Sequence, residues 1–132
     1  MNDRYLFRGK RKDGQGWIEG DLVHTRTTTQ GVVTEIYTLD MSYEVDPETV
    51  GQCTGLKDKN GKLIFEGDIV KGLFNFGLEI MSVCTFKDGA FGLTAKQCGA
   101  YHFSAFTSMC NVKYEVIGNI HDNPELLESD TR

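Results

Sequence analysis

Two copies of one short motif carry the acidic side chains that could do chemistry. The motif reads Ile-Glu-Gly-Asp-Leu-Val at residues 18–23 and Phe-Glu-Gly-Asp-Ile-Val at residues 65–70. Brought together, its four acids would form a carboxylate cluster suited to metal binding or acid–base catalysis. Glycine beside a turn acid is also ordinary backbone chemistry, so we favour a structural interpretation, with equivalent strand breaks at Gly20 and Gly67. The acids are Glu19, Asp21, Glu66 and Asp68.

The cysteines and histidines do not occur at ligand or nucleophile spacings. No two of the four cysteines form a Cys-x-x-Cys pair, which is the spacing that zinc ribbons and redox motifs use. We therefore predict four reduced thiols and no structural metal, with an assembled metal site or a disulfide as the alternative. The three histidines are scattered along the chain. The cysteines are Cys53, Cys84, Cys98 and Cys110, and the histidines are His24, His102 and His121.

Other polar segments also lack a catalytic signature. Residues 114–122 include Tyr114, Asn119, His121 and Asp122, which could line a small pocket. Polar residues at strand ends more often make turns. No Gly-Lys-Ser/Thr run of a phosphate-binding loop occurs anywhere in the chain. We predict no catalytic, cofactor-binding or metal-binding residues and no cofactor, and hence a protein that is not an enzyme.

The composition is that of an ordinary soluble domain. Of 132 residues, 25% are charged and 39% are hydrophobic, and the net charge is −5. This acidic balance argues against generic nucleic-acid binding through bulk electrostatics. No run approaches the ~18 apolar residues of a membrane span, and the N-terminus lacks the apolar core of a signal peptide. We expect a cytoplasmic protein without a membrane partner.

Period-two alternation and hairpin dipeptides predict a mainly β fold, of the β-rich α+β class, with short antiparallel strands. Asp88-Gly89 joins two strand-like runs and supplies the positive φ values of a tight hairpin. Asp46-Pro47 and Asn123-Pro124 are helix-start signals. They predict short helices near residues 47–50 and at the C-terminus.

The predicted organisation has two units, which could pack as one compact domain. Residues 1–45 would form an N-terminal β unit, and residues 46–132 an SH3-like β-barrel unit. Small barrels of this kind use a glycine–acid step where a strand leaves a loop and enters the core. We therefore expect the second Glu-Gly-Asp motif to enter the barrel.

The order of several sequence blocks resembles a known family. The blocks are Phe7-Arg8-Gly9-Lys10, Trp17-Ile18-Glu19-Gly20, Pro47 through Asp58, Asn60-Gly61-Lys62, Glu66-Gly67-Asp68-Ile69-Val70, Tyr114 through Ile120, and Asp122 through Leu127. They are similar to blocks of the YopX family of prophage-encoded proteins. The resemblance implies a phage or prophage origin, a bacterial host cell and a β-rich fold with an SH3-like barrel. It implies no site residue, because the family has no established biochemical function.

The charge distribution is the one pointer to a partner. Cations dominate the first twelve residues, and acids dominate the last eleven. The basic N-terminal hairpin could be a solvated surface, or it could attract the acidic end of the chain. A third interpretation is contact with nucleic acid, with Tyr5, Phe7 and Trp17 as stacking groups. The cations are Arg4, Arg8, Lys10, Arg11 and Lys12.

Three classes of function stay open. The leading one is a non-enzymatic binding or accessory module of a prophage, which self-associates and acts on an unknown host or phage macromolecule. The alternatives are a nucleic-acid-binding module that uses the basic N-terminal hairpin, and an enzyme with a site assembled from scattered acids and histidines. A homo-oligomer is expected because the second half holds more aromatic surface than a small barrel buries. These residues are Phe65, Phe74, Phe76, Phe86, Phe91, Phe103 and Phe106.

Overall fold

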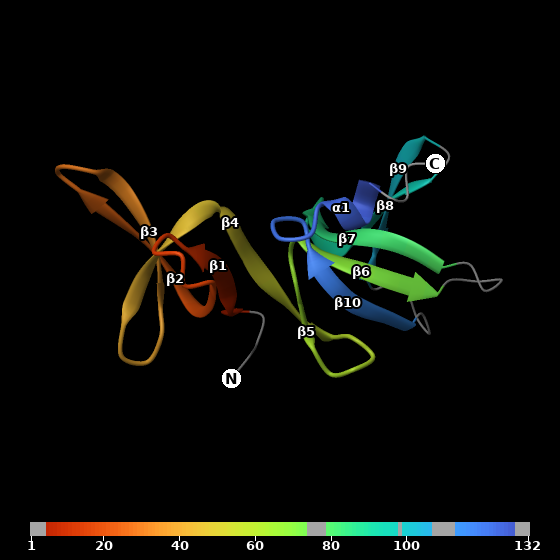
Figure 1. The fold of residues 1–132 in the computed structure, drawn as a ribbon, viewed down its shortest axis with the longest axis horizontal. Coiled ribbons are helices and arrows are strands. Elements are labelled where there is room, and N and C mark those ends of the chain that lie inside the picture. Colours follow the sequence, from red (N-terminus) through yellow and green to blue (C-terminus); the bar gives the residue numbers. More distant parts are fainter. Residues whose placement is uncertain (1–4, 74–78, 98, 107–112, 129–132) are drawn as a thin grey trace. The chain divides into compact units, whose positions relative to one another are not determined.

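The fold is mostly β, as predicted. The structure, a computed structural model, describes residues 5–73, 79–97, 99–106 and 113–128. These residues form ten β-strands and one short α-helix (Figure 1). The chain divides into two compact units, Met1–Gly55 and Leu56–Arg132. In the described ranges, no helix is long and apolar enough to cross a membrane.

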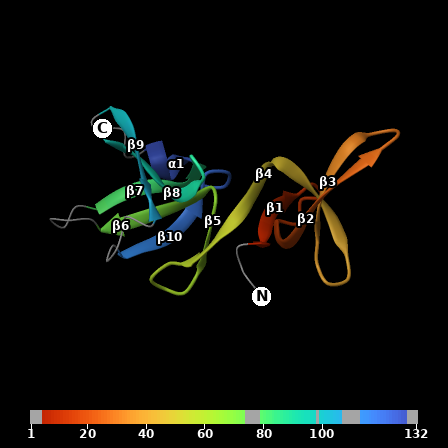
Figure 2. The same cartoon turned by 180° about the vertical axis from the view of Figure 1, so that it is seen from behind.

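The first unit is a closed ring of four antiparallel strands. They are β1 (Phe7–Arg11), β2 (Trp17–Thr27), β3 (Gly31–Tyr37) and β4 (Ser42–Lys57). Each strand pairs with the next, and β1 also pairs with β4. Phe7 therefore lies opposite Gly20 on one side and Gln52 on the other. The four strands are coloured from red to yellow in Figures 1 and 2. Closure removes the unpaired edges that a small open sheet would expose.

The short helix expected near residues 47–50 was a wrong prediction, because these residues belong to β4. Asp46 uses its side chain to accept the Glu48 N–H at 3.1 Å, and its carbonyl accepts the Thr49 hydroxyl at 2.6 Å. Thr49 Oγ1 in turn accepts the Lys10 N–H at 2.8 Å. The pairing of β1 with β4 shifts register at this point. The Asp-Pro pair thus makes a local irregularity within a strand, where proline is tolerated.

The second unit is built around a five-stranded antiparallel sheet in the order β10-β6-β7-β8-β9. The tight hairpin predicted at Asp88-Gly89 is confirmed, since both residues have positive φ, 52° and 82°. The strands of this sheet are β6 (Asp68–Leu73), β7 (Glu79–Lys87), β8 (Ala90–Gln97), β9 (Ala100–Ala105) and β10 (Lys113–Asn119). The unit also contains β5 (Leu63–Phe65), which is not part of this sheet, and the helix α1 (Glu125–Glu128).

One face of this sheet carries the core of the second unit. The core residues are Ile64, Val70, Cys84, Leu93 and Val116, with Phe106 and Tyr114 packed against them. The first five come from β5, β6, β7, β8 and β10, so the core forms only when β5 packs against these four strands of the sheet. The closed ring of strands lies in the first unit. In the described part of the second unit, β9 and β10 end the sheet without pairing with each other.

The repeated Glu-Gly-Asp motif does not form two equivalent strand breaks, so that prediction is wrong. Gly20 lies within β2, opposite Phe7. Gly67 lies in the turn between β5 and β6, with a φ of 93° that side-chain-bearing residues rarely adopt. The same three residues thus allow close packing of two strands in one copy and form a turn in the other. A Cβ atom at Gly20 would lie 2.2 Å from the Tyr37 carbonyl oxygen.

The close approach at Gly20 generates the first test. Changing Gly20→Ala forces β2 and β3 apart, because a carbonyl oxygen of β3 occupies the space of the new methyl group. We expect a loss of about 1–3 kcal/mol in the free energy of unfolding, the usual cost of overpacking. Urea unfolding followed by the fluorescence of Trp17, the one tryptophan, reports on the first unit.

The matched control is Glu19→Ala, which removes an exposed side chain next to Gly20. This change should leave the urea midpoint nearly unaltered. Equal midpoints for Gly20→Ala and the unmodified protein would show that β2 and β3 tolerate a methyl group between them.

Candidate functional site

The four acids of the repeated motif have separate structural settings. Glu19 and Asp21 are exposed on β2. Asp68 is 1% exposed, and its carboxylate accepts the Phe65 N–H at 2.8 Å, which fixes the turn between β5 and β6. Among the described residues, no group of three or more histidines, cysteines or acids could hold a metal ion.

The cysteines and histidines that are described do not gather into a site. Cys53 and Cys84 are buried and are not joined in a disulfide, whereas Cys98 and Cys110 lie outside the described residues. His24 and His102 are exposed, and His121 is half-buried in a turn. Buried free cysteine behaves as a small apolar side chain, and Cys84 does so in the core.

The polar run that ends β10 makes a turn. The side-chain oxygen of Asn119 accepts the N–H groups of His121 and Asp122, both at 2.9 Å. Asn123 accepts the Asn119 N–H at 3.2 Å. Tyr114 packs on Phe106, with ring centroids 5.7 Å apart. The structure therefore uses Asn119 as the organiser of a turn.

The basic N-terminal hairpin holds its cations against aromatic rings and acids. The Arg8 guanidinium lies 4.9 Å from the centroid of the Trp17 ring, and that of Arg11 lies 4.0 Å from the Tyr43 ring. Arg11 also forms an ion pair with Asp13. Lys12 pairs with Glu44 at 2.8 Å, which raises the pKa of the lysine. These contacts lower the positive potential that the hairpin offers to a phosphate backbone.

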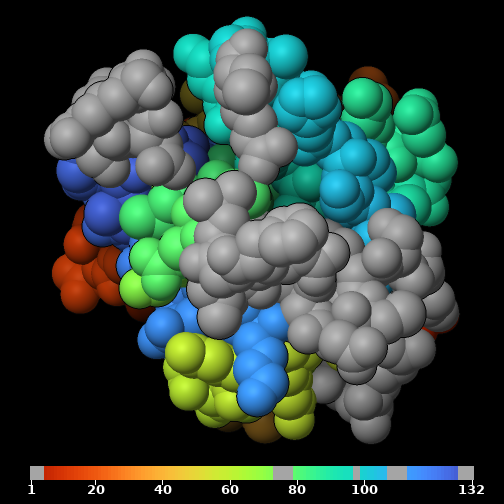
Figure 3. All heavy atoms as spheres, turned by 90° about the vertical axis from the view of Figure 1, so that its right-hand side faces the viewer, coloured from red at the N-terminus to blue at the C-terminus, as the bar shows by residue number. Residues whose placement is uncertain are grey.

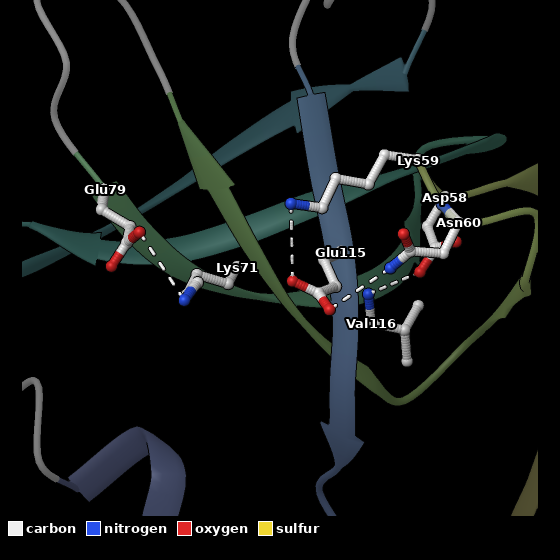
Figure 4. A network of polar contacts seen from close by, with 7 residues as sticks. All are labelled: Asp58, Lys59, Asn60, Lys71, Glu79, Glu115 and Val116. Atoms are coloured by element: carbon white, nitrogen blue, oxygen red, sulfur yellow. Dashed lines mark hydrogen bonds and ion pairs between the residues drawn. The ribbon is translucent and has the colours of Figure 1, made fainter.

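A carboxylate in the turn between β4 and β5 organises the edge of the second unit's sheet. Asp58 is buried, and its two oxygens accept three backbone N–H groups at 2.9 Å each. Two donors, Asn60 and Lys62, belong to its own turn. The third, Val116, lies in β10 (Figure 4). One side chain thus shapes the turn and anchors it to a distant strand.

Further contacts strengthen this attachment to β10. The Lys59 N–H donates to the Tyr114 carbonyl at 3.0 Å. The Lys59 ammonium lies 3.7 Å from the Glu115 carboxylate, which also accepts the Asn60 side-chain amide at 3.3 Å (Figure 4). The turn therefore occupies hydrogen-bonding groups of β10 that β6 does not use.

The environment of Asp58 lowers its pKa. Burial opposes ionisation, but the N–H groups of Val116, Lys62 and Asn60 together outweigh this effect by stabilising the charged carboxylate. A group whose pKa is lower in the folded protein adds stability above its unfolded pKa, about 3.9 for aspartate. That stability is lost as the pH falls through the pKa of the folded protein.

The Asp58 contacts generate the second test. Changing Asp58→Asn replaces one acceptor oxygen by an amide donor, and so leaves at least one backbone N–H without its partner. We expect a loss of about 2–3 kcal/mol in the free energy of unfolding at pH 7. The stability of the variant should also fall less steeply than that of the unmodified protein as the pH drops below about 4.

Chemical denaturation at a series of pH values measures both effects. Asp88→Asn is the control, because it makes the same chemical change at an exposed hairpin position with a positive φ, which asparagine tolerates. If both variants lose the same stability, the hydrogen bonds of Asp58 are not what stabilises the second unit.

An apolar pocket lies on the sheet face opposite the core of the second unit. Along β7, Ser82 and Cys84 are buried. Met81, Val83 and Thr85 alternate with them, so their side chains point to the other face. The pocket has a volume of about 190 Å³. Its lining residues are Met81, Val83, Thr85, Thr94, Lys96, Tyr101 and Leu127.

The chemistry of this pocket is that of a binding site for an apolar group. The hydroxyls of Thr85 and Thr94 are hydrogen-bonded to each other at 2.8 Å, so they offer little to a ligand. Among the described lining residues Lys96 alone is charged, and its ammonium lies 5.9 Å from the centroid of the Tyr101 ring. In Figure 3, β8 and β9 lie on the surface in cyan. None of the described residues that line the pocket is an acid, a histidine or a cysteine.

Sequence reasoning missed this pocket. Its lining comes from β7, β8, β9 and α1, and no two of the lining residues are adjacent in the sequence. A signal was present in the alternation of Met81, Val83 and Thr85 with buried residues. That pattern marks one apolar strand face but does not say whether another element covers it.

A family model and solved structures match this chain. The family model described as "YopX protein" matches residues 6–128. The crystal structure of protein yopX from Bacillus subtilis is 23% identical, with a TM-score of 0.58, and the match covers 96% of this chain and 99% of that one. Protein EF1440 from Enterococcus faecalis is 22% identical, with a TM-score of 0.45 and coverage of 93% and 96%. No curated protein matches this chain.

Proposed function

Because the chain belongs to the YopX family, we propose that it is a phage- or prophage-derived accessory protein acting as a non-enzymatic binding module. It works in the cytoplasm of a bacterial host, where its partner is a host or phage macromolecule. The observation that carries the proposal is the apolar pocket on β7, β8 and β9. Such a pocket holds an apolar side chain and provides one cation for orientation. Cys53 and Cys84 are not joined in a disulfide, which fits a reducing compartment.

The arrangement of the second unit supports an SH3-like barrel. Strands β6 to β9 follow one another as an antiparallel meander, and the last strand, β10, returns to pair with β6. SH3-like barrels have this strand order, and the fold hosts many unrelated functions. The assignment fits a binding role, since SH3 domains bind extended peptides.

The positions of the ionisable groups favour a binding role over an enzymatic one. Active sites gather acids and bases with shifted pKa values in a cleft, whereas Asp58 has its lowered pKa in a structural turn.

For nucleic acid, the second candidate partner, the supporting feature is an open hollow of about 460 Å³ in the second unit. Its lining includes Lys57, Lys59 and Lys113. Tight, salt-dependent binding of DNA or RNA at physiological salt would promote that candidate.

Affinity capture from prophage-bearing cells tests the binding role. Met81→Lys places a charge in the apolar pocket and should abolish recovery of the partner. Met41→Lys makes the same change at an exposed position of the first unit and should leave recovery unchanged. A partner recovered equally with both variants would show that binding does not use the pocket.

Self-association is a second part of the proposal. Phe86 and Tyr101 are 53% and 73% exposed in the second unit, and Leu39 is fully exposed in the first. Phe65 is buried, and Phe74 and Phe76 lie outside the described residues. Exposed aromatic side chains of this size often mark interfaces.

Light scattering at micromolar concentration measures the assembly directly. We expect a mass above that of the 14.8 kDa chain, with a decrease on dilution or after Phe86→Ser. His102→Ser, a change at another exposed position of the second unit, is the control. A monomer mass across a tenfold dilution series would rule out the homo-oligomer.

A further inference from the structure

A leucine and an aspartate form the tip of the hairpin made by β3 and β4. This tip, Leu39 and Asp40, lies at the far end of a hairpin that projects from the first unit (Figure 1). The Thr38 N–H and hydroxyl both donate to the Met41 carbonyl, at 2.7 and 3.1 Å. These bonds close the turn without using the side chains of Leu39 and Asp40, which are therefore available for other contacts.

Turn geometry does not explain a leucine at this position. Glycine, asparagine, aspartate and serine are the residues that favour tight turns. Leu39 is fully exposed, and the apolar residues on either side of the tip, Tyr37 and Met41, are exposed as well. Binding residues are concentrated on loops that a rigid scaffold positions, and grouped apolar side chains on a surface mark interaction sites. The tip therefore has the features of a binding element.

The apolar pocket of the second unit has the complementary chemistry. Its lining includes the apolar residues Met81, Val83 and Leu127 and the cation Lys96. Lys96 is exposed, so a carboxylate that arrives from outside can reach its ammonium. Within the described ranges, no acid forms an ion pair with Lys96 and no cation forms one with Asp40. An apolar side chain that is followed by an acid matches this pocket in both shape and charge.

We propose that Leu39 of one copy of this chain inserts into the apolar pocket of a second copy, where Asp40 pairs with Lys96. Adjacent Cα atoms are only about 3.8 Å apart, so one turn delivers both side chains to the same place. This inference rests on the self-association and on the binding pocket proposed above, and it identifies the surfaces that the copies use. The host or phage macromolecule then competes with the hairpin for the pocket.

A contact of this kind joins two different surfaces and is therefore heterologous. Each copy has one hairpin tip and one such pocket, so each copy can bind two others. Heterologous contacts produce rings or open filaments, whereas an isologous contact ends at a dimer. Burial of the leucine supplies the apolar part of the affinity, and the ion pair selects the orientation.

Exchange of the two charges tests the contact in full-length chains by sedimentation velocity over a concentration series. Asp40→Lys and Lys96→Glu should each weaken association about tenfold, because each places like charges opposite one another. A chain with both changes should regain the affinity of the unmodified protein. Asp40→Lys combined with Lys113→Glu, the same change on β10, is the matched control and should stay weak. Equal affinities for the two double variants overturn the proposal.

A mixing experiment distinguishes contact between copies from contact within one chain. Leu39→Glu removes the apolar tip and keeps the pocket, whereas Met81→Lys blocks the pocket and keeps the tip. Each variant alone should associate at least about tenfold more weakly than the unmodified protein. An equimolar mixture should form a one-to-one complex, because one variant retains the pocket and the other the tip. Val32→Glu, at another exposed apolar position of the first unit, should associate like the unmodified protein.

The outcomes separate this contact from self-association in general. A monomeric unmodified protein contradicts both. If Phe86→Ser weakens association and Leu39→Glu does not, self-association stands and the contact of Leu39 with the pocket is wrong. A mixture that forms no complex also overturns the contact between copies. If Met81→Lys unfolds the chain, the charge exchange decides alone, since Asp40, Lys96 and Lys113 are exposed.

Discussion

Acceptance of three backbone N–H groups by the Asp58 carboxylate is the interaction on which the second unit depends. The donors come from a turn and from β10, which are 54 residues apart between Lys62 and Val116. Burying a carboxylate is costly unless hydrogen bonds compensate it. Here they do so, and they also place Val116 in the core. Because β10 ends the sheet, its attachment decides whether the apolar residues of β6 and β10 stay enclosed and whether that edge is available to other chains.

Local sequence signals predicted local structure well. The alternating runs are strands, and Asp88-Gly89 is a hairpin because its geometry depends on two residues alone. The helix predicted from Asp46-Pro47 was wrong because the conformation of this pair depends on a contact with a distant residue. The pair favours a helix start in isolation, but here the Lys10 N–H of β1 bonds to Thr49 and holds the segment in β4. The duplicated Glu-Gly-Asp motif differs between its copies because β3 crosses close to Gly20.

The surface could be predicted less well than the strands. A count of cations in the N-terminal hairpin suggested a basic patch, yet Lys12 pairs with Glu44, 32 residues away. The pocket was unpredictable for a related reason, since its walls meet only after β7, β8, β9 and α1 have assembled. Charge and apolarity are properties of single residues, whereas electrostatic potential and concavity belong to their arrangement. Electrostatic potential and concavity decide what a surface can bind.

The closure of the first unit brings the two ends of its chain segment together. The Cys53 N–H donates to the Leu6 carbonyl at 2.8 Å, so the chain enters and leaves the ring at neighbouring points. A segment whose two ends coincide can be inserted into a host chain or excised from it with little distortion of the flanking backbone. The stretch from residue 6 to residue 53 meets this geometric condition.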